Sequence, residues 1–189
     1  QSADRVVYRE PAQEFGVSLG RTQSRAFATL SSGDGSSNEI RLLPTADFTA
    51  EPVLISPRKE NRRYDVDERE GILYIRVNDT HVNFRIVTAK VASPAAWTEM
   101  IAGSDRHYLL GITSFENLLA IEERIEGLSQ IRMRDYDSGA ERYIAFPEAS
   151  YVASLAGNPE YRVDRLRLSY QSMVTPSTAR KNTQPSMSP

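Results

Sequence analysis

The feature that most limits the fold of this sequence is a two-residue alternation of apolar and polar side chains, which recurs along nearly the whole chain. In the segment DRLRLSYQSM, the side chains of Leu166, Leu168 and Tyr170 share one face of a predicted strand, because successive strand residues point to opposite faces. Apolar stripes with helical spacing are nearly absent, and Gly, Asn, Asp, Ser and Pro separate the alternating runs. The sequence therefore predicts an all-β fold.

The predicted strands form groups of four. The groups begin at Phe15, Arg62, His107 and Tyr151, which are roughly 44 to 47 residues apart. Four strands in a repeat of this length are typical of a β-propeller blade. This predicts a partial β-propeller with about three complete four-stranded blades and most of a fourth. The alternative is an irregular β-sandwich, whose turns recur at a similar spacing. The expected strands lie near residues 15–20, 25–31, 38–43, 52–56, 62–67, 71–77, 83–88, 97–101, 107–113, 117–124, 128–136, 142–146, 149–155 and 164–172.

Three segments carry more local predictions. The strand GILYIRVN has apolar residues on both faces, so both faces are expected to be covered, with Arg76 at a solvated end. The segment 114–126 could form a helix, but its flanking turns and its place in a group favour a strand. Asp137, Ser138 and Gly139 are expected to form a turn between two strands.

A serine nucleophile is not indicated by the sequence pattern. The string that comes nearest to the nucleophile elbow G-x-S-x-G is Gly127-Leu128-Ser129-Gln130-Ile131, in which Ile131 replaces the final glycine. We interpret it as a hairpin turn that enters a strand. The chain has two histidines, and His81 in a polar turn and His107 at a strand start are both expected to be structural or surface residues.

Three further segments resemble ligand sites only in part. Asp65 and Asp67 could begin a calcium loop, but its twelfth position is Arg76 instead of a glutamate, so a strand end with a solvated turn is expected. The glycines in 31–39 lack the lysine and the helix of a phosphate loop, which favours a hairpin loop. The basic run at 57–63 is expected to be a solvated connection.

Composition excludes some partners and suggests a compartment. The net charge of −2 implies neither nucleic acid nor an anionic membrane as a partner. No apolar run approaches the roughly 20 residues that span a bilayer, and the first residues do not have the pattern of a signal peptide. The chain contains no cysteine, which excludes disulfides and thiolate metal sites and fits a reducing compartment, so a cytoplasmic location is expected.

Several strings together resemble a known family. They are SSGDGSSNEIRLLPTADFTAEPVLISPRKENRRYDVD, YIRVNDTHVNFRIVTA, GITSFENLLAIEERIEGLSQIRMR and NPEYRVDRLRLSYQSMVTPST, in this order along the chain. The last contains a Y-x-S-x-x-T-P-x-T signature, formed by Tyr170, Ser172, Thr175, Pro176 and Thr178. The sequence resembles the second half of the N-terminal β-propeller in the oligopeptidase B branch of the prolyl oligopeptidase family of serine peptidases.

This resemblance implies a fold and a role. Members of the family carry a seven-bladed propeller above an α/β-hydrolase domain that holds the catalytic Ser, Asp and His. They cleave short peptides, after Arg or Lys in oligopeptidase B, and the propeller limits access by size. The triad lies beyond the matched segment, so we assign no catalytic, cofactor-binding or metal-binding residue to this chain and expect no cofactor. The implied partners are the hydrolase domain and short peptides.

The resemblance also sets the expected boundaries. Residues 1–178 are predicted to form the partial propeller, with RVVYRE as the last strand of a preceding blade. Residues 179–189, ARKNTQPSMSP, are predicted to be a disordered tail because they lack alternation. On this interpretation the chain is a propeller fragment that has no catalytic domain, and whether it takes part in an enzyme stays open. The alternative is a non-catalytic binding or scaffold module that self-associates through open blade edges.

Overall fold

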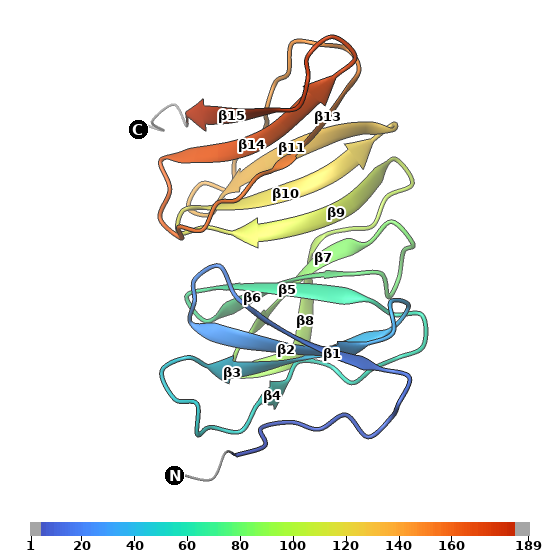
Figure 1. Ribbon diagram of the computed structural model, residues 1–189, viewed down its shortest axis with the longest axis vertical. Helices are drawn as coiled ribbons and strands as arrows, with labels where there is room; N and C mark the ends of the chain where they lie inside the picture. Colours follow the sequence, from blue (N-terminus) through green and yellow to red (C-terminus); the bar gives the residue numbers. More distant parts are fainter. Residues whose placement is uncertain (1–4, 184–189) are drawn as a thin grey trace.

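The computed structural model describes residues 5–183, which form fifteen strands in four antiparallel sheets (Figure 1). No helix in the described part of the chain could cross a membrane. The strands are β1 (Gly16–Arg21), β2 (Phe27–Gly33), β3 (Asn38–Pro44), β4 (Val53–Leu54), β5 (Tyr64–Arg69), β6 (Ile72–Val77), β7 (Arg85–Lys90), β8 (Ser93–Ile101), β9 (His107–Ser114), β10 (Leu118–Ile125), β11 (Leu128–Asp135), β12 (Glu141–Tyr143), β13 (Tyr151–Leu155), β14 (Arg165–Ser172) and β15 (Thr178–Thr183).

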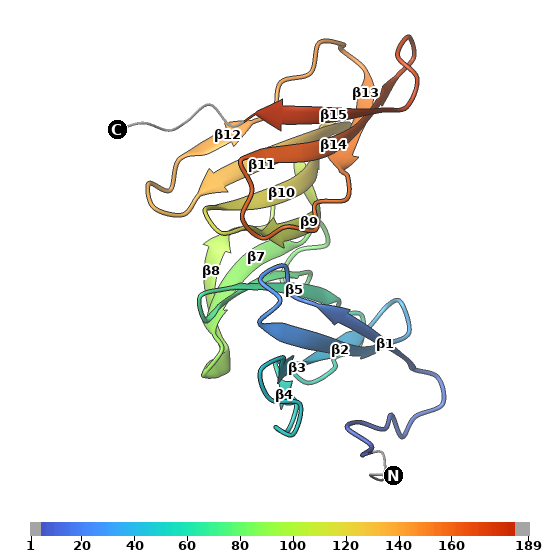
Figure 2. The same cartoon turned by 60° about the vertical axis from the view of Figure 1, so that its left-hand side comes forward.

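Each sheet is a meander in which neighbours in the sequence are neighbours in space. The first sheet contains β1 to β4, the second β5 to β8, the third β9 to β12, and the fourth β13 to β15. The sheets follow one another along the long axis of the molecule (Figures 1 and 2). The prediction of three four-stranded blades and an incomplete fourth is confirmed, and the sandwich alternative is wrong because four small sheets replace two large ones.

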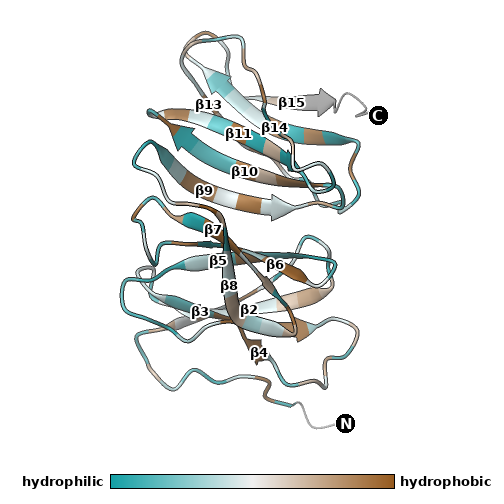
Figure 3. Cartoon of the chain, turned by 180° about the vertical axis from the view of Figure 1, so that it is seen from behind, coloured by the Kyte–Doolittle hydropathy of each residue, from teal (hydrophilic) through white to brown (hydrophobic). Residues whose placement is uncertain are grey.

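Three apolar cores lie between successive sheets, one at each junction. Figure 3 shows the origin of these cores, since hydrophobic and hydrophilic bands alternate along strands such as β9 and β14. The buried members of the first core are Ile40, Leu42, Ile55, Tyr64, Leu73, Ile75, Val77, Val87 and Ala89. Those of the second are Tyr74, Phe84, Ile86, Leu109, Leu119 and Ile121. Those of the third are Phe115, Leu118, Ala120, Ile131, Met133, Ile144, Ala153, Leu166, Leu168 and Tyr170.

Strand β6 shows how one strand supplies two cores. Leu73, Ile75 and Val77 pack into the core against the first sheet, whereas Tyr74 and the half-buried Ile72 belong to the core against the third sheet. The prediction that both faces of this strand are covered is confirmed. A single sheet of this kind therefore depends on both of its neighbours for burial.

The prediction of a solvated end at Arg76 is wrong. The Arg76 side chain is buried, because the third sheet covers this part of β6. Its Nη1 donates a hydrogen bond of 2.8 Å to the carbonyl oxygen of Leu109, and its Nε lies 2.8 Å from Oδ2 of Asp65. The guanidinium also lies 4.0 Å from the centre of the Phe84 ring. These partners satisfy the buried charge.

The end of the propeller also differs from the prediction. Residues 179–183 belong to β15, which pairs with β14 from Tyr170↔Thr178 to Arg165↔Thr183. The prediction of disorder from residue 179 is therefore wrong for these five residues. A strand ladder is made by main-chain groups, so the free edge of β14 can hold a segment without alternation. The rest of the predicted tail, 184–189, lies outside the described residues.

At the other end, RVVYRE is not a strand. This segment instead lies on the first sheet through its side chains. The Arg41 guanidinium sits 4.4 Å from the centre of the Tyr8 ring, and Glu10 pairs with Arg58 at 2.7 Å and accepts a hydrogen bond from Ser32. Those side-chain contacts replace the main-chain ladder that a strand would need.

Two local predictions in the third sheet are confirmed. Most of the segment 114–126 is strand β10, paired on one side with β9 and on the other with β11, so the helix alternative is wrong. The turn at 137–139 connects β11 to β12, and Oδ1 of Asp135 accepts hydrogen bonds from both the main-chain N–H and the hydroxyl of Ser138. Gly139 has a φ of 68°, a conformation that glycine adopts without steric cost.

The packing of β6 yields a stability prediction. Ile75→Ala is expected to lower the free energy of unfolding by about 2–5 kcal/mol, because Ile75 is fully buried between two sheets and its loss leaves a cavity. Val152→Ala is the control, since this strand residue is 61% exposed and should cost about 0.5 kcal/mol or less. Urea denaturation measures both values. Equal costs for the two variants would contradict the packing of this face of β6 against the first sheet.

Candidate functional site at the inner strand ends

The two histidines lie where the sequence pattern placed them, one near a turn and one at the start of a strand. His81 lies in the turn before β7, where its Nδ1 accepts a hydrogen bond of 3.1 Å from the main-chain N–H of Asn83. Gly103 packs against this ring, and a Cβ added there would come within 2.3 Å of the His81 Cβ. His107 begins β9, with Nδ1 3.1 Å from Oε2 of the buried Glu123. Within residues 5–183, neither imidazole is hydrogen-bonded to a serine hydroxyl.

The segment that partly resembles a nucleophile elbow is a hairpin turn, as predicted. Glu126 and Gly127 have φ angles of 51° and 87°, and β10 and β11 are paired from Ile125↔Leu128 onward. Two successive positive φ angles are the geometry of a two-residue hairpin loop. Ser129 is buried within β11 and is not presented on a strand-to-helix turn.

The carboxylates of DVDERE have a different role from the predicted one. Asp67 and Glu68 are both buried in β5, so the expectation of a solvated strand end is wrong for them. Asp65 instead pairs with Arg76, the residue at the position where a calcium loop needs its closing glutamate. Across the described residues, no group of three or more His, Asp or Glu side chains could hold a metal ion.

Asp67 joins three sheets through main-chain hydrogen bonds. Its Oδ1 accepts from the N–H of Gln23, which follows β1, at 2.8 Å, and from the N–H of Glu68 at 2.9 Å. Its Oδ2 accepts from the N–H of Ser114, the last residue of β9, at 2.7 Å. The first strands of three successive sheets therefore meet at one carboxylate that is only 6% exposed. We call this contact the Asp67 joint.

Burial controls the titration of the Asp67 joint. Burial raises the pKa of Asp67 to about 6, because its effect outweighs that of the three N–H donors, which favour the ionised form. Glu68 lies beside it and accepts hydrogen bonds from the Ser24 hydroxyl at 2.5 Å and from the Gly71 N–H at 2.6 Å. Asp67 and Glu68 are thus neighbouring buried carboxylates, and the donors that bind them are mainly uncharged.

An aromatic and basic layer surrounds the joint. The hydroxyls of Ser114 and Tyr136 are 2.6 Å apart, and burial raises the pKa of Tyr136. Arg69 lies 4.4 Å from the centre of the Tyr136 ring and donates from Nε to the Glu116 carbonyl oxygen at 2.6 Å. These contacts tie the second sheet to the turn between β9 and β10.

The basic run at 57–63 is partly buried, which corrects the prediction of a solvated connection. Arg62 is 6% exposed and donates to Ser56 and to the Pro57 carbonyl oxygen. Arg58 lies 3.5 Å from the centre of the Phe15 ring and pairs with Glu10. Charge density alone gave no sign of burial, because the partners of these two arginines come from other parts of the chain as well as from their own loop.

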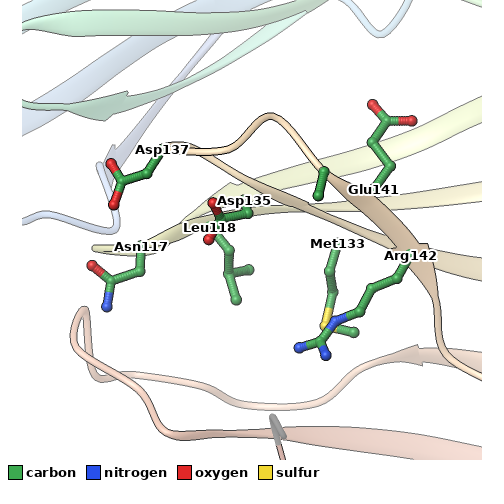
Figure 4. A pocket seen from close by; sticks show the side chains of 8 residues that line it. Asn117, Leu118, Met133, Asp135, Asp137, Glu141 and Arg142 are labelled. Atoms are coloured by element: carbon green, nitrogen blue, oxygen red, sulfur yellow. The ribbon is translucent and has the colours of Figure 1, made fainter. Parts of the chain in front are cut away.

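The structure also contains an open hollow of about 330 Å³ beside the β11–β12 turn (Figure 4). Two of its three carboxylates already have partners, because Asp135 binds Ser138 and Glu141 pairs with Arg132 and Arg134. Two of its lining residues are members of the third apolar core. The lining residues are Asn117, Leu118, Met133, Asp135, Asp137, Ala140, Glu141 and Arg142.

Sequence reasoning missed the Asp67 joint, although the repeat length carried a signal for it. Asp67 lies 44 residues after Gln23 and 47 residues before Ser114, which are the spacings of the predicted blades. Residues one repeat apart occupy equivalent positions on successive blades. A carboxylate at such a position is therefore close to the main chain of both neighbours.

A family model and two known proteins match nearly the whole chain. The family model described as prolyl oligopeptidase, N-terminal β-propeller domain, matches residues 1–181. Dipeptidyl aminopeptidase BI of Pseudoxanthomonas mexicana is 33% identical over 180 residues, which are 94% of this chain and 25% of that protein. Protease 2 of Moraxella lacunata is 23% identical over 176 residues, 93% of this chain and 25% of that protein. The chain thus spans about a quarter of these relatives.

Solved structures share the fold. Oligopeptidase B from Leishmania major superimposes with a TM-score of 0.88 at 23% identity, over 97% of this chain and 28% of that one. Oligopeptidase B from Trypanosoma brucei gives 0.87 at 22% identity, over 94% of this chain and 27% of that one. The arrangement of four sheets is therefore that of a propeller segment, and the family predicted from the sequence motifs is confirmed.

The Asp67 joint yields a prediction about pH. The folded-state pKa of about 6 lies above the ordinary value of 3.8, so the folded state holds the proton more tightly. The free energy of unfolding, taken as wild type minus Asp67→Asn, should therefore fall by about 2 kcal/mol as the pH rises from 4 to 7. Urea denaturation at a series of pH values measures this difference.

Asp34→Asn is the matched control for this experiment. Hydrogen bonds from the main-chain N–H of Ser37 and from Ser36 lower the pKa of Asp34, which lies in an exposed hairpin loop. Its contribution to stability is present above the ordinary pKa and is lost as the pH falls. The wild type minus Asp34→Asn difference should therefore rise with pH. Slopes of the same sign for both variants would exclude this account of the joint.

Proposed function

The chain belongs to the prolyl oligopeptidase family, within its N-terminal β-propeller domain, and on this basis we propose that it forms part of a propeller that covers the active site of a serine oligopeptidase. The observation that carries the proposal is the family match across residues 1–181, together with the successive antiparallel sheets that are arranged as blades. The role of the chain is then to restrict the access of substrates to that active site. This role belongs to the arrangement of the blades as a whole.

The catalytic groups of such an enzyme would come from an α/β-hydrolase domain that packs against the propeller. Two observations support this division. The described part of the chain brings no serine hydroxyl to either histidine, and relatives about four times as long match over this segment alone. The hydrolase domain is therefore the proposed partner of this chain.

The proposed substrates of the whole enzyme are short peptides. A closed propeller admits an extended chain more readily than a folded domain, so the enzyme would select its substrates by size. Cleavage after Arg or Lys is proposed from the likeness to proteins named oligopeptidase B. We propose a cytoplasmic location, supported by the absence of cysteine from the sequence.

An alternative is a non-catalytic scaffold that associates through its first sheet. Strand β1 is an edge strand, and all six of its residues are exposed, with Leu19 at 79%. An edge strand offers unpaired main-chain groups to another chain. This strand supports self-association as a second candidate role.

A chimeric enzyme tests the leading proposal. The matched quarter of dipeptidyl aminopeptidase BI from P. mexicana is replaced by this chain, and peptide hydrolysis is measured. The chimera should hydrolyse a short peptide substrate of its parent within about tenfold of the parental rate, because the propeller supplies no reacting group. It should leave a folded protein substrate uncut.

Two controls complete this experiment. Circular dichroism and thermal unfolding establish that the chimera is folded. The 189-residue chain alone is treated with a fluorophosphonate probe, which should not label it. Labelling of the chain at a serine, or a folded chimera that digests a folded protein as readily as a peptide, would contradict the proposed role.

Light scattering tests the scaffold alternative. If β1 pairs between molecules, the purified chain should have a mass above its monomeric 21.2 kDa at micromolar concentration. Leu19→Lys should shift it toward the monomer, because a charge on an edge strand opposes pairing. Arg21→Lys keeps the charge of the same strand and serves as control. A monomeric wild-type chain would exclude this alternative.

A further inference from the structure

One connection in the fourth sheet differs from its counterparts in the other sheets. The loops that follow the first strand of the first, second and third sheets span five, two and three residues, at 22–26, 70–71 and 115–117. The corresponding loop in the fourth sheet spans nine residues, 156–164. We call it the β13–β14 strap. It extends away from its own sheet toward the β1–β2 turn (Figures 1 and 2).

The strap is anchored firmly where it leaves the fourth sheet. The side chain of Asn158 donates to the carbonyl oxygens of Ala156 and Arg167 at 2.8 and 2.9 Å, and it accepts from the Arg167 N–H at 2.7 Å. Val163, near the other end of the strap, packs against the third apolar core. Both ends of the strap are thus fixed to β14 or to the core beneath it.

The middle of the strap contacts the third sheet, which is itself bonded to the second. The main-chain N–H of Glu116 donates to the Tyr161 carbonyl oxygen at 3.1 Å. The Arg162 guanidinium pairs with the Glu116 carboxylate at 2.7 Å. Because the carbonyl of Glu116 also accepts from Arg69, this turn joins the strap to β5 as well.

The strap reaches the first sheet through three consecutive carbonyl groups. Nε2 of Gln23 donates to the carbonyl oxygens of Asn158 and Glu160, at 2.7 and 2.9 Å. The Arg25 guanidinium donates to the Pro159 carbonyl oxygen at 2.8 Å. These donors are 134 to 137 residues from their acceptors, so the contact joins the first sheet to the fourth.

The first-sheet residues of this contact are held more firmly than the contact itself. On the first sheet, the main chain of Gln23 is fixed by the Asp67 joint, and the N–H of Arg25 donates to the Thr22 carbonyl oxygen at 2.9 Å. The side chains of Gln23 and Arg25, by contrast, contact the strap through hydrogen bonds at a partly exposed surface. Such bonds break at far lower cost than an apolar core.

We propose that the β13–β14 strap ties the fourth sheet to the first, across β5 and the loop that follows β9, and that the first and fourth sheets separate only when its hydrogen bonds to Gln23 and Arg25 break. The strap then sets how far this part of the propeller opens. Its effect on peptide entry rests on the proposed function, whereas the tie itself is a property of this chain.

The test uses the variant Gln23→Met/Arg25→Asn. Methionine keeps the length of Gln23 but removes its donors, and asparagine removes the guanidinium while tolerating the positive φ of 63° at position 25. Hydrogen exchange of the Glu116 amide reports whether the strap is in place, because that amide donates to Tyr161. Exchange should be about tenfold faster or more in the variant.

A distance measurement reports on the sheets themselves. The chain has no cysteine, so Phe48→Cys and Met173→Cys introduce two spin labels at exposed positions, one in the β3–β4 loop of the first sheet and one in the β14–β15 loop of the fourth. Pulsed electron paramagnetic resonance should give a narrow distance distribution in the labelled parent. It should give a broader and longer one when the strap variant is added to the labelled pair.

Arg21→Ala is the matched control, since this exposed arginine lies at the end of β1 and has no recorded bond to the strap. It should leave both measurements unchanged. Unchanged amide exchange and an unchanged distance distribution in a folded Gln23→Met/Arg25→Asn variant would overturn the proposal, as would equal changes in the Arg21→Ala control.

The chimeric enzyme separates this inference from the proposed function. If the chimera is active, releasing the strap should raise its relative rate on longer peptides, and an unchanged length preference would refute the effect on entry. If the chimera is folded but does not discriminate by size, the proposed function fails. The exchange and distance measurements on the 189-residue chain then still decide whether the strap ties the sheets.

Discussion

The whole structure depends on one constraint: a four-stranded sheet with two apolar faces cannot bury both faces by itself. Strand β6 shows this most clearly, since Ile75 needs the first sheet and Tyr74 needs the third. Burial is therefore shared between neighbours, and each blade is stable only as part of a row. The three cores, the loops between sheets and the polar contacts at the strand ends all follow from this requirement.

The sequence was enough to predict β1 to β14, because the same constraint gives their side chains a two-residue alternation. Leu166, Leu168 and Tyr170 point into one core as their spacing indicated, and the hairpin at Gly127 lies where glycine and polar residues mark it. Strand β15 escaped prediction because its pairing with β14 is made by main-chain groups, which leave no pattern in side-chain chemistry.

The polar contacts were harder to predict, for a physical reason. Arg76 and Asp67 belong to residue types that are ordinarily exposed, and their burial depends on acceptors and donors supplied by the neighbouring sheets and their loops. The partners from neighbouring sheets, Leu109 for Arg76 and both Gln23 and Ser114 for Asp67, are close in space but 33 to 47 residues away along the chain. No local pattern distinguishes an arginine that meets a carbonyl group from one that meets water. Only the repeat length connected Asp67 with its partners.

The Asp67 joint also has a consequence for how the sequences of such chains evolve. Its carboxylate lies in one blade, but the N–H groups that it binds come from the blades on either side. The donors are main-chain groups, which any residue except proline provides, so a neighbouring blade can be exchanged with little regard to its sequence. What must be kept is the place of each partner within its own blade. An insertion in β1, β5 or β9 that shifts these positions separates the partners, whereas an insertion in a loop after the second or third strand of a blade leaves them in register. Length variation among relatives should therefore be found mainly in the loops that follow the second and third strands of each blade.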